Sequence, residues 1–342
     1  MSGFNDITGV PASANHYTLT EVLKNKWGHD GFVISDWGSV RNLVEQGVAK
    51  DKKEAGMKSF LAGVEMDMVD NVYVDYLPEL VAEGKVPMTA IDEAVRRILR
   101  VKMKLGLFEN PYVDVVPEKK RYLLPEYLKA AEELASESMV LLKNEKETLP
   151  ITSKYKSLAI IGPMVKDSIN IMGSWEGKGQ PKDVETIYEG LEKEFKDKAT
   201  LNYALGCDFD GEDRNGFKDA LEAARKSDAV IVFLGEKKHW SGENGSRSTI
   251  ALPKIQEDLV VELLKAKKPI ILMLSSGRPL ELIRLNKIAD AIVEIWQPGT
   301  MAGSAVAGIL SGRHNPSGKL SITFPQTTGQ IPIYYNMRQS AR

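Results

Sequence analysis

Short, strongly apolar runs alternate with helical segments over the second part of the chain. Five or six such runs are present: Leu158–Gly162, Leu201–Leu205, Ala229–Gly235, Ile270–Ser275, Ala291–Trp296 and Leu320–Phe324. Continuous apolar runs of this length are typical of strands buried on both faces, and their alternation with helices is typical of a parallel sheet. The pattern predicts an open, mostly parallel α/β sheet with helices on both faces. Functional groups in such sheets gather beyond the carboxyl ends of the strands.

The first part of the chain contains about two strand–helix units. The predicted elements are a strand over Gly31–Asp36, a helix over about 39–61, a strand over Val64–Met68 and a helix over Thr89–Leu105. In the last helix, Thr89 and Asp92 predict a capping box, and Gly106 predicts the end. A closed (β/α)₈ barrel needs eight such units and ~250 residues. We therefore expect this part to be a piece of a domain.

A segment rich in charge and proline, Asn110–Pro125, separates the two parts and is predicted to be a linker. A helix over about Glu126–Lys143 is predicted to follow it. The expected domain division is 1–112, then a linker and helix over 113–145, then an α/β domain over 146–342.

Composition excludes several classes of function. The formal net charge of the 342 residues is −2, so no overall field favours nucleic acid or an acidic membrane. The longest apolar runs are far shorter than the roughly 20 residues of a membrane span. The single cysteine, Cys207, excludes an intrachain disulfide framework. No metal-ligand spacing is found among the four histidines, which are His16, His29, His239 and His314. We therefore expect no metal, no cofactor, no nucleic acid and no membrane as partners.

Asp36 is a candidate catalytic residue because it ends a barrel-type strand, where (β/α)₈ enzymes place their catalytic side chains. Trp37 follows it directly, and a carboxylate beside an indole suits sugar chemistry because aromatic faces pack against the apolar faces of pyranoses. The alternative is an aspartate that caps the following helix.

Glu243 is a second candidate. It lies in the loop Trp240–Arg247, which follows the predicted strand Ala229–Gly235 and contains glycines at positions 242 and 245. Glycines allow unusual backbone conformations, so the carboxylate can project towards a neighbouring domain. The alternative is an exposed acidic loop in which Glu243 pairs with Arg247.

A series of motifs in one order along nearly the whole chain resembles glycoside hydrolase family 3, and within it the pattern of bacterial periplasmic β-glucosidases. The motifs are Gly9–Asn15, Trp27–Gly28, Gly31–Gly38, Ala62–Asp67, Arg96–Lys102, Leu105–Pro111, Ser136–Asn144, Gly173–Trp175, Ser241–Arg247, Gly277–Pro279, Asn315–Leu320 and Gln330–Tyr335. The resemblance implies a (β/α)₈ barrel, here an incomplete C-terminal portion, followed by an α/β sandwich domain. The active site is implied to lie at their interface.

The resemblance also assigns roles to individual residues. It maps the nucleophile onto Asp36 and the acid/base onto Glu243. Trp37 and Trp175 match positions that flank the leaving-group subsite, and Arg247 matches a residue that orients the loop or forms an ion pair near the site. Phe4 stands where many members carry tyrosine, so the hydroxyl group at that subsite position is absent.

The function that follows is retaining, exo-acting hydrolysis of β-glycosides, in which a β-glucosidase releases glucose from the non-reducing ends of β-linked oligosaccharides by double displacement. Two alternatives stay open: a β-xylosidase of the same family, and a catalytically incompetent carbohydrate-binding fragment. A nucleotide-binding domain over 150–335 is disfavoured because the phosphate-loop fingerprint is absent.

The expected partners are a β-linked oligosaccharide or glucose, and an N-terminal barrel portion that is either a companion chain or a cleaved segment. A homo-oligomer is left open. The expected location is periplasmic or secreted. We expect the 342-residue chain by itself to be inactive or unstable.

Overall fold

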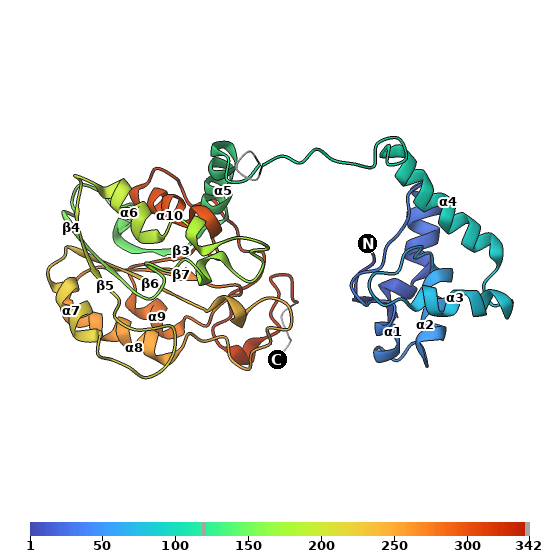
Figure 1. Cartoon of the computed structure of the whole chain (residues 1–342). Coiled ribbons are helices and arrows are strands. Elements are labelled where there is room, and N and C mark those ends of the chain that lie inside the picture. Colours follow the sequence, from blue (N-terminus) through green and yellow to red (C-terminus); the bar gives the residue numbers. More distant parts are fainter. Residues whose placement is uncertain (118–120, 339–342) are drawn as a thin grey trace. The chain divides into compact units, whose positions relative to one another are not determined.

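The computed structural model describes residues 1–117 and 121–338 and divides the chain into two compact units, Met1–Val116 and Pro117–Arg342 (Figure 1). Each unit has its own buried core. No helix in the described ranges is long and apolar enough to cross a membrane.

Unit 1 is mainly helical. Its elements are β1 (Asp6–Ile7), β2 (Val10–Pro11), a 3₁₀ helix (Ala12–Ala14), a π-helix (Tyr17–Lys26), α1 (Asn42–Glu45), α2 (Lys52–Ala62), α3 (Val72–Ala82) and α4 (Met88–Lys104). Val40, Phe60, Tyr73 and Leu80 form part of a core between α2, α3 and α4.

The two predicted strands of unit 1 lie parallel, but they pair only through an isolated bridge between Ile34 and Met66. The Ser35 N–H donates to the Met66 carbonyl at 2.8 Å, which is the same pairing that neighbouring barrel strands make. On the other side of Ile34, the Ser2 N–H donates to the Ile34 carbonyl at 2.9 Å, and these few backbone hydrogen bonds form only a minimal ladder. The predicted pair of strand–helix units is therefore present, with strands shorter than expected.

The helices of unit 1 differ from the prediction in three places. The expected helix over 39–61 is two helices, because Gly47 takes a positive φ of 74° and Asp51 begins α2 by accepting a hydrogen bond from the Glu54 N–H at 2.8 Å. Helix α3, which contains Pro78, was not predicted. The predicted capping box at Thr89 is wrong: α4 begins one residue earlier, and Pro87 is its N-cap.

Unit 2 contains a six-stranded sheet in the order β3-β8-β7-β6-β4-β5. The strands are β3 (Val140–Asn144), β4 (Ser157–Ile161), β5 (Thr200–Ala204), β6 (Ala229–Gly235), β7 (Ile270–Ser275) and β8 (Ala291–Glu294). Every neighbouring pair is parallel except β3 and β8, which are antiparallel. The prediction of an open, mostly parallel sheet is confirmed.

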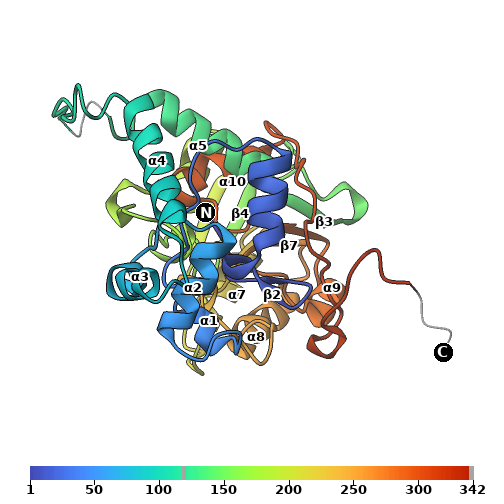
Figure 2. The same ribbon diagram turned by 90° about the vertical axis from the view of Figure 1, so that its right-hand side faces the viewer.

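Helices cover both faces of the sheet. They are α5 (Pro125–Ser138), α6 (Ile187–Phe195), α7 (Phe217–Arg225), α8 (Lys254–Leu263), α9 (Ile283–Ile288) and α10 (Ala302–Ser311). In Figures 1 and 2, α5 and α10 lie on one side of the sheet and α8 and α9 on the other. One core joins Ile231 and Met273 to the α6 and α10 face, and a second joins Val232 and Leu272 to the α7 and α8 face.

Short 3₁₀ helices make up the rest of the regular structure of unit 2. They are Glu145–Glu147, Asn170–Met172, Pro181–Asp183, Lys238–Trp240, Leu264–Ala266, Gly299–Met301 and Thr328–Gln330.

Two predicted elements of unit 2 are wrong. The helix expected over Glu126–Lys143 stops at Ser138, and the following apolar residues form β3 at the sheet edge. The strand expected over Leu320–Phe324 does not form. The apolar side chain of Phe324 is instead partly buried by packing against the core beneath α8 and α9, without strand pairing.

Candidate active site

Asp36 lies in a loop that backbone and serine hydrogen bonds hold in place. Its N–H donates to Ser39 Oγ at 3.1 Å, and Ser35 Oγ accepts from the Met68 N–H at 2.7 Å, so the loop is tied to the neighbouring strand segment. The Trp37 N–H donates to Asp36 Oδ1 at 2.7 Å. Within the described residues no hydrogen bond reaches Asp36 Oδ2, so one carboxylate oxygen is oriented and the other is available.

The surroundings of Asp36 favour the catalytic interpretation over the helix-cap interpretation. The next helix, α1, begins only at Asn42, so Asp36 is too early in the chain to cap it. Asp36 is half-buried. Trp37 beside it is 68% exposed, and Phe4, also in unit 1, is 39% exposed with its carbonyl accepting from Gln46 Nε2 at 2.7 Å. The two rings present exposed aromatic surface.

The other acidic residues of this strand segment have structural partners. Glu65 forms an ion pair with Lys24 and accepts from the Val33 N–H at 2.7 Å. Asp67 accepts from the Val72 N–H at 2.7 Å, and its burial raises the pKa of its carboxyl group. Over residues 1–117 and 121–338 no group of three or more His, Cys, Asp or Glu side chains is arranged to hold a metal ion.

Glu243 lies at the tip of a tight turn beyond the carboxyl end of β6. Gly242 has a φ of 97° and Asn244 a φ of 59°, and the Gly245 N–H donates to the Gly242 carbonyl at 3.1 Å. The positive φ values turn the chain sharply, which glycine allows at little cost. The side chain of Glu243 is exposed and, in the described part of the chain, makes no hydrogen bond or ion pair.

Trp175 stands beside this turn. Ser174 Oγ lies 2.7 Å from the Ser241 carbonyl oxygen and 2.6 Å from the Lys238 carbonyl oxygen, and its hydroxyl donates to one or the other, which ties the Gly173–Trp175 segment to the Glu243 loop. A Cβ atom added to Gly242 would lie 3.8 Å from Trp175 Nε1. Since Trp175 is 73% exposed, its indole is available to a ligand that reaches the turn.

Arg247 does not pair with Glu243, so the alternative in which these two residues neutralise each other is wrong. Arg247 Nη1 lies 3.9 Å from Glu236 Oε1, and its guanidinium lies over the Trp240 ring at 4.7 Å. Glu236 also binds Arg278, at 3.3 Å between Oε2 and Nε. Sequence reasoning assigned no role to Glu236, nor to Arg278 within the motif Gly277–Pro279. The available signal was that Glu236 directly follows the long apolar run of β6.

The six candidate residues thus form two local groups. Asp36, Trp37 and Phe4 belong to unit 1. The second group, in unit 2, comprises Glu243, Trp175 and Arg247.

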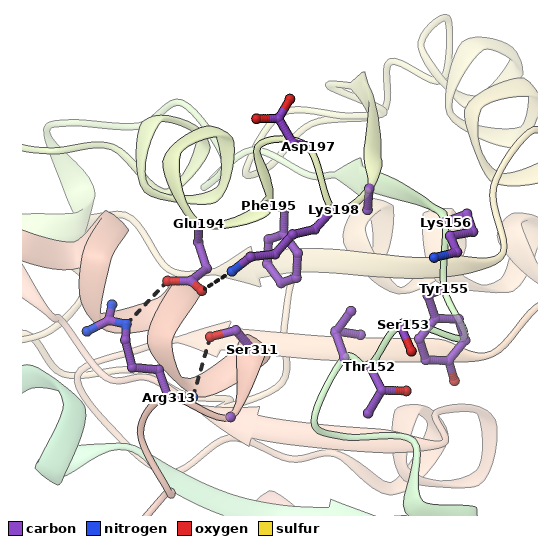
Figure 3. Close-up of a pocket in the computed structure, with 13 residues that line it drawn as sticks. Thr152, Ser153, Tyr155, Lys156, Glu194, Phe195, Asp197, Lys198, Ser311 and Arg313 are labelled. Carbon is purple, nitrogen blue, oxygen red and sulfur yellow. Dashed lines mark hydrogen bonds and ion pairs between the residues drawn. The ribbon is translucent and has the colours of Figure 1, made fainter.

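Unit 2 also contains a separate cavity of about 500 Å³, and Figure 3 shows the residues that line it. Lys156 in its wall directly precedes β4, so the cavity lies at the amino end of that strand, whereas the Glu243 loop follows the carboxyl end of parallel β6. Its central carboxylate, Glu194, is bound by Lys198 at 3.0 Å and Arg313 at 3.2 Å. Glu194 is therefore neutralised, which does not suit acid catalysis.

Comparison with known proteins covers both units. The model of the glycosyl hydrolase family 3 N terminal domain matches residues 1–101, and that of the family 3 C-terminal domain matches residues 139–342. The chain is 36% identical to a periplasmic beta-glucosidase of Salmonella typhimurium, over 100% of this chain and 48% of that protein. It is also 36% identical to a beta-xylosidase of Formosa agariphila, over 98% of this chain and 48% of that protein.

Solved structures give the same family. The beta-glucosidase of Listeria innocua matches with a TM-score of 0.91 and 38% identity, over 99% of this chain and 46% of that one, and it has been solved with glucose and, as a mutant, with laminaribiose. The chain therefore spans about half the length of the relatives it matches. On the matches to both family domains, this chain belongs to glycosyl hydrolase family 3.

Proposed function

We propose that the chain supplies both catalytic carboxylates of a retaining, exo-acting β-glucosidase. The observation that carries the proposal is the shared local environment of the Asp36 and Glu243 carboxyl groups. Each lies on a loop held by its own hydrogen bonds, and each has an exposed indole next to it. Membership of the family supports the same chemistry.

Asp36 acts as the nucleophile. Its Oδ2 attacks the anomeric carbon, while Oδ1 keeps the hydrogen bond from the Trp37 N–H. That hydrogen bond fixes the plane of the carboxylate during attack. It also stabilises the carboxylate when it leaves in the second displacement, because hydrogen bonds to a charged acceptor are stronger than those to a neutral one.

Glu243 acts as the acid and then as the base. A retaining mechanism requires the two carboxyl groups to be about 5–5.5 Å apart when substrate is bound. Glu243 protonates the departing oxygen, and the aglycone leaves. It then takes a proton from the water that attacks the glycosyl-enzyme. The change of role is favoured because esterified Asp36 no longer carries the negative charge that raises the proton affinity of Glu243.

The sugar subsites are proposed from the exposed aromatic residues. Trp37 and Trp175 pack against the leaving-group sugar, Phe4 contributes apolar surface near the nucleophile, and Arg247 holds the acid/base loop through Glu236. The substrate class is β-linked gluco-oligosaccharides. A β-xylosidase is the second candidate because one similar relative is a beta-xylosidase. The ratio of kcat/KM for nitrophenyl β-glucoside and nitrophenyl β-xyloside separates the two.

A partner polypeptide and a location complete the proposal. Unit 1 joins its two strand segments through one parallel bridge, whereas a (β/α)₈ barrel closes with eight strands. We propose that the remaining strands come from an N-terminal barrel portion, as a companion chain or a cleaved segment. We also propose the division 1–112, 113–145 and 146–342, and a periplasmic location like that of the Salmonella relative.

The decisive experiment is labelling with a 2-fluoro-β-glucoside that carries a good leaving group, followed by intact-mass measurement and peptide mapping. It is done on the chain alone and on the chain supplied with an N-terminal barrel portion. One adduct on Asp36 is expected. Asp36→Asn should abolish labelling, and Asp30→Asn should retain it, because Asp30 pairs with Lys104 on the surface of unit 1 at 2.6 Å.

Two results would count against the proposal. Turnover of Asp36→Asn near the wild-type rate contradicts the nucleophile assignment. Sugar binding that survives Glu243→Gln, with no label on Asp36 in any preparation, favours a non-catalytic carbohydrate-binding protein.

A further inference from the structure

The turn that carries Glu243 is held at both of its ends by a single guanidinium group. Arg278 Nη2 donates to the Gly245 carbonyl at 3.1 Å and to the Trp240 carbonyl. These two carbonyls lie just outside the Gly242–Gly245 hydrogen bond that closes the turn. One planar group therefore fixes the distance between the two ends of the turn.

The guanidinium group of Arg278 is itself held in place by a buried acidic side chain. Its Nε donates to Glu236 Oε2 at 3.3 Å, and the side chain of Glu236 is only 2% exposed. The Glu236 N–H donates to the Ser275 carbonyl at 3.0 Å, so the acid is anchored where β6 and β7 end. Attraction between unlike charges is stronger where water is excluded, so this pair resists displacement more than a surface pair does.

The acid/base candidate has no such restraint of its own. Glu243 makes no hydrogen bond or ion pair among the described residues, and its neighbours in the turn are glycine and asparagine with positive φ. The place of its carboxyl group is thus set by the two ends of the turn, and Arg278 holds both.

We propose that Arg278, fixed by Glu236, is a positioning residue for the acid/base Glu243. The inference rests on the proposed function and adds to it the group that sets the reach of the acid. A displacement of a reacting group by about 1 Å can lower a rate by about 100-fold. Lysine at this position keeps the positive charge. Its compact ammonium group lacks the planar set of N–H donors with which arginine binds two carbonyls and a carboxylate at the same time.

The test compares the activity of three variants: Arg278→Lys, Glu243→Gln and a matched control, Arg284→Lys. All are made in the preparation that is active in the labelling experiment. Arg284 is also an arginine in ion pairs, with Glu257 at 3.4 Å, but it lies on α9 and its side chain is 43% exposed. The readout is kcat/KM, which reports formation of the glycosyl-enzyme, for β-glucosides with good and poor leaving groups. Dinitrophenolate leaves without being protonated, whereas the leaving sugar of a β-linked disaccharide must be protonated by the acid as the bond breaks.

For Arg278→Lys we expect kcat/KM on the disaccharide to fall by about 10- to 100-fold, a part of the 10²- to 10⁴-fold that general acid catalysis contributes. The dinitrophenyl glucoside should be hydrolysed almost as by wild type. Arg284→Lys should behave as wild type on both substrates. If Arg278→Lys does not fold, Arg278→Gln removes the guanidinium while Glu236 keeps its ion pair with Arg247, and the same dependence on leaving group is expected.

An equal loss on both substrates, or no loss on either, overturns the positioning role, since a general weakening of the fold does not distinguish leaving groups. The two proposals fail separately. If the loss of kcat/KM in Glu243→Gln does not depend on the leaving group, the proposed function is contradicted. If it does depend on the leaving group but Arg278→Lys loses activity equally on both substrates, only the role of Arg278 is contradicted.

Discussion

A methyl group added at Gly277 should displace the Glu243 loop and lower activity without unfolding the protein. A Cβ atom at this position would lie 2.2 Å from Ser241 Oγ and 2.6 Å from Ser241 Cβ. The hydroxyl can rotate away, but Ser241 Cβ moves only with its backbone. Because ordinary contacts begin at 3.4 Å, the Ser241 backbone must shift by about 0.8 Å relative to residue 277.

This shift sets the expected size of the effect. Ser241 lies two residues before Glu243, and its carbonyl and hydroxyl are tied to Ser174 and Gln297. A shift approaching 1 Å at a catalytic group corresponds to a loss of about 100-fold in kcat/KM. Overpacking by one methyl group costs about 1–3 kcal/mol, or roughly 2–12 °C in Tm for a unit of this size, so the variant should still fold.

The assay is kcat/KM on nitrophenyl β-glucoside together with thermal unfolding of Gly277→Ala, Gly308→Ala and the double variant Gly277→Ala/Ser241→Gly. A Cβ atom at Gly308 meets the side-chain ends of His314 and Arg313, which can move, so this control should keep full activity. The double variant removes the atoms that clash and should regain part of the activity. A folded Gly277→Ala enzyme with wild-type kcat/KM refutes the reasoning.

Two further predictions concern stability. In Gly190→Ala the new Cβ atom would lie 2.0 Å from the backbone carbon of Gly303, so α6 and α10 must separate. We expect the free energy of unfolding in urea to fall by about 3 kcal/mol, only partly offset by the better helix propensity of alanine. An unchanged urea midpoint would contradict this prediction. Burial raises the pKa of Glu294 well above its ordinary 4.5, so the folded protein holds a proton that the unfolded chain releases. The stability of the fold should therefore fall as pH rises above about 4.5, and Glu294→Gln should remove that fall. Parallel curves of Tm against pH for the variant and the wild type would argue against this prediction.

The central strands were predictable because burial on both faces leaves a local record in the sequence. All seven residues of β6 and all six of β7 are buried, and each strand appears as an unbroken apolar run. The candidacy of Asp36 also comes from local sequence, since it needs only the end of a strand, a neighbouring tryptophan and the family motif around it, and its catalytic role stays a prediction.

Elements that depend on a distant partner were not predictable in the same way. Val140–Asn144 continues a helical pattern and becomes strand β3 only because β8, about 150 residues later, offers it an edge.

The sequence by itself determined the class of fold and the family, and it predicts the two catalytic carboxylates, because apolar periodicity and short motifs are local properties. Tertiary structure decided how the loop that carries Glu243 is held. Glu236 and Arg278 are 42 residues apart and meet only because β6 and β7 are neighbours in the sheet. A buried charge finds its partner through the packing of the sheet, and spacing along the chain carries no record of that choice.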